Sequence, residues 1–167
     1  NHVEILVEKN TVFSMVKKVA MEYRIPVTSG RGNSSKAPIW EIVKRFNSSG
    51  KQKLLLLLLS DFDSDGISIT ESVVGYMLND FAEYGIDEDT LHPVRMGLWR
   101  EQVEAMDDPP RSLEPNLNSP NYTRFVDEHG TDCWELEAIP PQQLQDIVRG
   151  AIDSVIEIEA FNAEVAA

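Results

Sequence analysis

The strongest constraint on the fold is a run of six leucines, Leu54–Leu59, which follows a turn-like Asn-Ser-Ser-Gly and leads into alternate aspartates. A wholly apolar run lacks helical periodicity and is typical of a strand buried on both faces, as in a parallel sheet covered by helices. Six residues are also too few to span a bilayer. The run therefore predicts a central strand over residues 54–59.

The aspartates after this strand allow two interpretations. The pattern DxDxDG at residues 61–66 begins like a calcium-binding EF-hand loop, but the position that should supply a bidentate glutamate is Ser72. The leucines before it also lack the pattern of an entering amphipathic helix. The other interpretation, which we favour, is a magnesium site at the end of a buried strand. Calcium buffering remains a rival.

Strand and helix patterns alternate along the first hundred residues, which predicts a three-layer, Rossmann-like α/β fold with a mainly parallel central sheet. We expect a catalytic core over residues 1–100 and a C-terminal extension of loop and helix over residues 101–167, packed on the core. Thr11 is expected to cap the first helix. The predicted strands are 3–8, 25–28, 54–59 and 91–96, with a further extended segment at 132–137, and the predicted helices are 11–23, 37–46, 66–84, 101–106 and 140–158.

Charge is distributed unevenly along the chain. The net charge is −13, yet residues 1–53 carry a net charge of +6 and residues 54–167 a net charge of −19. The basic first third can face phosphates, although a solvated surface explains these charges equally well. The single cysteine, Cys133, excludes an internal disulfide and a cysteine-based zinc cluster. With neither a signal peptide nor a transmembrane run in the sequence, we expect a cytoplasmic protein without membrane partners.

Acidic residues follow two of the predicted strands. Glu8 ends the first strand, and Asp61 and Asp63 follow the third. If these strands are neighbours, the three carboxylates converge on one edge of the sheet, where ligands of α/β proteins bind. Such a cluster repels itself unless a cation compensates it, and hard oxygen ligands suit Mg²⁺ or Mn²⁺. A helix cap or a surface charge is the ordinary explanation for any single acid of this kind.

This ordered set of motifs resembles the Toprim domain: a glutamate after the first strand, a glycine turn after the second, and DxD after an apolar third strand. Val-Glu-Lys at 7–9 and Asp-Phe-Asp-Ser-Asp-Gly-Ile at 61–67 look most like the A subunit of topoisomerase VI. That group tends to have a proline near Ser64, which this chain lacks. Residues 95–103 and 134–141 look like uncharacterised Toprim-like proteins of bacteria and phages.

The resemblance implies magnesium-dependent chemistry on DNA phosphodiesters. Asp61 and Asp63 would be metal ligands, and Asp65 a third or water-mediated one. Glu8 would be a catalytic proton relay or help to hold a second metal. The tyrosine of type II and type VI topoisomerases has no counterpart on a separate domain here, so complete topoisomerase activity is not expected.

Further candidates come from the residues themselves. Lys9 flanks Glu8 and is a candidate catalytic residue, and Arg31 and Lys36 are candidate phosphate-binding residues together with Gly30 and Gly32, which let backbone approach an anion. An ordinary capped turn explains residues 29–36 equally well. Glu135 and Glu137 are a tentative second metal site, although alternating acids more often form the wet face of a strand.

The sequence thus predicts a Toprim-fold hydrolase, a nuclease that nicks or cleaves DNA with Mg²⁺, or with Mn²⁺ in its place. Because the chain is acidic, another domain or subunit is expected to supply DNA binding. Two alternatives stay open: the metal-binding half of a topoisomerase VI-like transesterase that needs a partner tyrosine domain, and a non-catalytic Toprim module for assembly.

Overall fold

A four-stranded, all-parallel sheet forms the centre of the computed structural model, which describes residues 1–30, 36–156 and 165. The strand order is β2-β1-β3-β4, and β1 pairs with β3 so that Val7 lies opposite Leu59. The predicted parallel α/β fold is therefore confirmed. The strands are β1 (His2–Val7), β2 (Val27–Ser29), β3 (Leu54–Leu59) and β4 (Leu91–Gly97).

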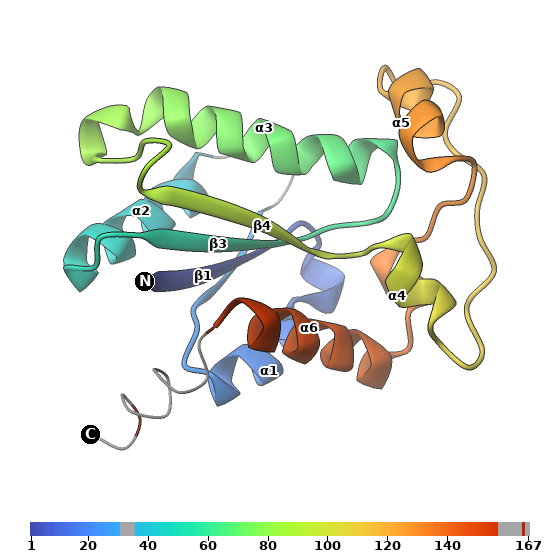
Figure 1. Cartoon of the computed structure of the whole chain (residues 1–167), viewed down its shortest axis with the longest axis horizontal. Coiled ribbons are helices and arrows are strands. Elements are labelled where there is room, and N and C mark those ends of the chain that lie inside the picture. Colours follow the sequence, from blue (N-terminus) through green and yellow to red (C-terminus); the bar gives the residue numbers. More distant parts are fainter. Residues whose placement is uncertain (31–35, 157–164, 166–167) are drawn as a thin grey trace.

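Helices cover both faces of the sheet and give three layers (Figure 1). Helices α2 (Ala37–Ser49) and α3 (Ser64–Asp80) lie on one face, and α1 (Phe13–Glu22) and α6 (Pro141–Val155) lie on the other. Alternate leucines of the run point to opposite layers, because Leu54, Leu56 and Leu58 pack with α2 and α3, whereas the other three pack with α1 and α6. All six are buried, as predicted for a strand covered on both sides.

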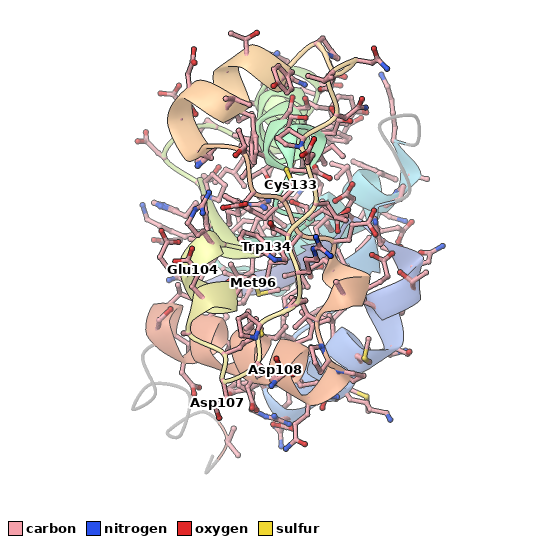
Figure 2. All side chains as sticks on the ribbon, turned by 90° about the vertical axis from the view of Figure 1, so that its right-hand side faces the viewer. Met96, Glu104, Asp107, Asp108, Cys133 and Trp134 are labelled. Carbon is pink, nitrogen blue, oxygen red and sulfur yellow. The ribbon has the colours of Figure 1, made fainter. Side chains whose placement is uncertain are left out.

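The C-terminal part of the chain crosses the end of the sheet at which the parallel strands finish (Figure 2). It contains α4 (Arg100–Glu104), α5 (Tyr122–His129), the 3-10 helix η3 (Leu136–Ala138) and α6. Trp134 forms an antiparallel bridge with Phe62, just beyond β3, and Cys133 forms another with Leu113. Side chains of this part share one hydrophobic cluster with β1 and α1.

Several predicted elements differ from the structure. Thr11 does not cap a helix, because it lies inside a 3-10 helix, η1 (Asn10–Val12). The Thr11 hydroxyl donates to Glu137 instead. The expected strand over 132–137 is reduced to two bridging residues before η3 begins, because Leu136 turns inward and is buried. Helix α5 was not predicted, and its Phe125 ring packs against the Phe62 ring beyond β3.

The remaining helices agree with the prediction apart from their ends. Helix α3 begins at Ser64 and ends at Asp80, where a short 3-10 helix, η2 (Ala82–Tyr84), follows it. In the part of the chain that the structure describes, no helix is both long enough and apolar enough to cross a membrane.

Candidate functional site

The ends of β1 and β3 bring Glu8 and Asp61 together. The in-register pairing of Val7 with Leu59 places the residues that follow both strands at one edge. The Glu8 backbone N–H donates to the Leu59 carbonyl at 3.0 Å, and the Asp61 backbone N–H donates to Glu8 Oε2 at 3.2 Å. The predicted convergence of these two acids at the carboxyl edge of the sheet is therefore present.

The turn from β3 into α3 is held by the aspartates themselves. Asp63 is the N-cap of α3, and its Oδ1 accepts the Gly66 N–H at 2.6 Å. A Cβ atom at Gly66 would lie 2.1 Å from the Asp61 carbonyl oxygen, so only glycine fits there. Asp65 Oδ1 accepts the Ser119 hydroxyl at 2.7 Å. Asp63 and Asp65 thus both have structural partners in addition to any ligand role.

Lys9 is the nearest cation to these acids. Its Nζ lies 2.8 Å from Asp61 Oδ2 and 3.1 Å from Glu137 Oε2, and the Thr11 hydroxyl donates to the other oxygen of Glu137 at 2.9 Å. Burial lowers the pKa of Lys9, but the hydrogen bonds to both carboxylates outweigh it and raise that pKa above its ordinary value. Lys9 is therefore the counter-charge of Asp61.

Arg95, which the sequence analysis did not single out, supports the same turn from β4. Its guanidinium donates to the carbonyls of Asp61 at 2.8 Å and Leu98 at 3.1 Å, and it lies 5.1 Å from the centre of the Trp99 ring. Burial lowers the pKa of Arg95 to about 10, while nearby acids, Glu8 foremost, raise it. An arginine inside a strand that is otherwise largely apolar was the signal available in the sequence.

The acids at this edge carry more negative charge than their surroundings compensate. Burial, together with the charge of Asp61, raises the pKa of Glu8 to about 7, although the Asp61 N–H lowers it in part. Burial also raises the pKa of Asp63, against the opposing hydrogen bond from Gly66. The Glu8 carboxyl consequently exchanges its proton near neutral pH.

We call the carboxyl edge that carries Glu8, Asp61 and Asp63 the acidic edge. Its carboxylates suit a hard cation, but they are not arranged as a formed metal site. Within residues 1–30, 36–156 and 165, no three His, Cys, Asp or Glu side chains are grouped closely enough to hold a metal. Asp61 is engaged by Lys9 and by the Leu136 N–H, which donates to Oδ1 at 2.8 Å. Carboxylate oxygens are nonetheless the ligands that Mg²⁺ takes in proteins, and a cation would relieve the repulsion that raises the pKa of Glu8.

The other candidate residues are only partly brought to this edge. Gly30 follows β2 and its N–H donates to the Val7 carbonyl at 2.8 Å, whereas Lys36 is exposed and pairs with Asp80 at 3.4 Å. Glu137 reaches Lys9, but Glu135 is exposed. Arg31 and Gly32 lie outside the described residues.

The cysteine near this edge is not an activated thiol. Cys133 is buried at the end of the sheet beside Trp134, as Figure 2 shows, and burial raises its pKa to about 11. A thiol that stays protonated at neutral pH is a packing residue and a poor nucleophile.

Comparison with known proteins adds no relative to this description. No family model matches the sequence. No curated protein matches it, and no solved structure matches its fold. The case for a function therefore rests on the residues at the carboxyl edge.

Proposed function

We propose that this chain is a Mg²⁺-dependent domain that cleaves DNA phosphodiester bonds by hydrolysis. The observation that carries the proposal is the contact of Glu8 with Asp61 at the carboxyl edge of the sheet, where the pKa of Glu8 is raised to about 7. A general acid or base works best when its pKa lies near the working pH. The order of the motifs and their resemblance to Toprim enzymes support the same chemistry.

The side chains at this edge have distinct roles in the proposal. Glu8 takes a proton from the attacking water or returns one to the leaving oxygen. Asp61 and Asp63 would hold Mg²⁺, which when bound would neutralise charge on the phosphate oxygens. Lys9 gives up Asp61 and keeps Glu137, which leaves its ammonium group beside the phosphate. Arg95 fixes the carbonyl of Asp61 and so the shape of the turn.

In this proposal, another domain or subunit supplies most of the DNA binding. Several cations of the basic first third are already paired within the chain: Arg45 with Glu4, Lys9 with Asp61, and Lys44 with Glu41. Fewer positive charges than the sequence suggests are thus free to bind phosphates, and the net charge is −13. Affinity for DNA depends strongly on such free charges.

The test is a plasmid-nicking assay with Mg²⁺, Mn²⁺ or Ca²⁺, accompanied by calorimetry of metal binding. The site variant is Asp61→Asn/Asp63→Asn, because asparagine keeps an acceptor for the Leu136 and Gly66 N–H groups while it removes both charges. The matched control is Asp107→Asn/Asp108→Asn, an exposed pair at the same end of the molecule (Figure 2), which changes the net charge equally.

We expect nicking with Mg²⁺ or Mn²⁺ in the wild type and the control, and none in the site variant. Ca²⁺ should bind without supporting cleavage. Metal binding without nicking would favour either a transesterase that needs a partner tyrosine or an enzyme whose DNA-binding domain is supplied elsewhere. If none of the three metals binds, the proposal is wrong and an assembly module is favoured.

A further inference from the structure

A cavity of about 350 Å³ opens beside Glu8, on the face of the sheet covered by α2 and α3. Its apolar walls come from β1, β3, α2 and α3, and include Leu6, Leu58, Ile39 and Val73. It lies where β1 and β3 end, and the helices that follow these two strands cover opposite faces of the sheet (Figure 1). Ligands of open α/β sheets bind at this kind of switch point.

Polar groups line the cavity beside its apolar walls: Glu8, Lys36, Ser60, Thr70, Ser72 and Tyr76. Glu8 contributes to the cavity and also contacts Asp61 at the acidic edge. Tyr76 lines the cavity too, and its buried hydroxyl has no hydrogen-bond partner of ordinary geometry among the described residues. Lys36 brings its ammonium group to 5.2 Å from the centre of the Tyr76 ring. Apolar walls with a few polar groups are typical of a small-molecule site.

We propose that this cavity binds an unstacked nucleobase of the nucleotide whose phosphate lies at the Glu8–Asp61 edge. The inference rests on the proposed function, because it extends the same site from the phosphate to the base. Ligand cavities span about 300 to 1,000 Å³, and this one is near the lower limit, which suits a compact ring better than a long chain. A base edge offers the buried Tyr76 hydroxyl a hydrogen bond of ordinary geometry, and Lys36, which also pairs with Asp80, complements the charge of a flanking phosphate.

The consequence is a preference for unpaired nucleotides. A base inside a duplex must leave its stack before it can enter a pocket, and this costs a few kcal/mol. A frayed end, a gap or a single strand avoids that cost. The chain should therefore bind single-stranded DNA more tightly than a blunt duplex of the same length.

The test is fluorescence titration with a short single-stranded oligonucleotide that carries one 2-aminopurine, in Ca²⁺ so that cleavage does not interfere. Val73→Phe fills the cavity. Val74→Phe is the matched control, because Val74 is also partly buried on α3 but does not line the cavity. Tyr76→Phe is a second variant that removes only the unpartnered hydroxyl.

We expect 2-aminopurine emission to rise on binding to the wild type and to Val74→Phe, as the base leaves its stack. Val73→Phe should lose roughly tenfold in affinity, which is the loss typical of one stacked base. Tyr76→Phe should lose less. Equal affinity of Val73→Phe and Val74→Phe, with both variants folded, would overturn the inference.

The outcomes separate this inference from the proposed function. If the wild type nicks DNA with metal but Val73→Phe and Val74→Phe bind the oligonucleotide equally well, the proposed function is supported and the nucleobase site is wrong. If Val73→Phe alone loses affinity but the wild type does not nick DNA, the nucleobase site is supported and the proposed hydrolysis is wrong. If the wild type neither binds the oligonucleotide nor nicks DNA, both fail.

Discussion

Glu4 lies within strand β1 and Glu8 directly follows it, but the charges around the two carboxylates are opposite. Glu4 is fully buried and almost fully compensated: Arg45 Nη2 lies 2.7 Å from its Oε1, Arg45 Nε lies 3.1 Å from both of its oxygens, and His2 lies 2.8 Å away. Glu8 accepts one backbone N–H at 3.2 Å and faces two other carboxylates.

The difference separates a structural charge from a reactive one. A buried charge with good hydrogen bonds to an opposite charge is stable and chemically silent. A carboxyl that is buried without an opposite charge close to it, and that also faces like charges, has a raised pKa, and its proton is available at neutral pH. Both residues are acids on or next to one strand, so position in the sequence alone does not distinguish them.

The largest expected effect comes from breaking the compensated pair. Among the described residues, Arg45→Met leaves His2 as the remaining side-chain partner of the buried Glu4, and we expect the free energy of unfolding to fall by about 3 kcal/mol. Urea denaturation at pH 7 measures it. The double variant Glu4→Gln/Arg45→Met should recover part of the loss. A decrease below about 0.5 kcal/mol would place this pair among ordinary surface ion pairs.

A smaller effect is expected at the turn that carries Asp61. Gly66→Ala forces a Cβ atom against the Asp61 carbonyl, and we expect a loss of about 2 kcal/mol in the free energy of unfolding, with weaker metal binding. Gly75→Ala on the same helix is the control, because its Cβ meets open space and the change should stabilise by up to about 1 kcal/mol. Thermal unfolding of both variants measures the difference in stability. Equal changes in Tm would show that the turn can accommodate a Cβ atom at residue 66.

The sharpest test of the comparison is the same substitution at both glutamates. Because the folded pKa of Glu8 is raised from 4.5 to about 7, the folded chain binds more protons than the unfolded chain in this interval, and stability falls as pH rises through it. Glu8→Gln should therefore stabilise the protein at pH 8, by about 2 kcal/mol, and have little effect at pH 4.

Glu4→Gln should act in the opposite direction and destabilise at pH 8, since it weakens the hydrogen bonds of Arg45 and His2. Urea denaturation of both variants across this pH range is the measurement. Effects of the same sign at both positions would remove the distinction between them.

The fold was predictable from the sequence because its signals are local. The leucine run and the alternation of strand and helix patterns identified the parallel sheet, and the bounds of β3 agree with the structure. Thr11 was misassigned because its partner, Glu137, lies far along the chain. Helix α5 was missed for a related reason, since its Phe125 ring packs against Phe62, which is distant in the sequence.

The candidate site divides in the same way. The meeting of Glu8 with Asp61 follows from the general rule that parallel strands end at one edge. The engagement of Asp61 by Lys9 and Leu136, and the support of the turn by Arg95, depend on contacts between distant segments. No local pattern reports such contacts, so the sequence identified the acids and not the groups that hold them.

The hydrogen bond from the Leu136 N–H to Asp61 joins residues 75 positions apart. A chain leaving the ribosome therefore exposes its acidic residues long before it can complete the edge that they form. The site should acquire its final shape only after residues 134–137 have emerged. The acidic edge is thus completed by a segment distant in sequence, which also closes the hydrophobic cluster around it.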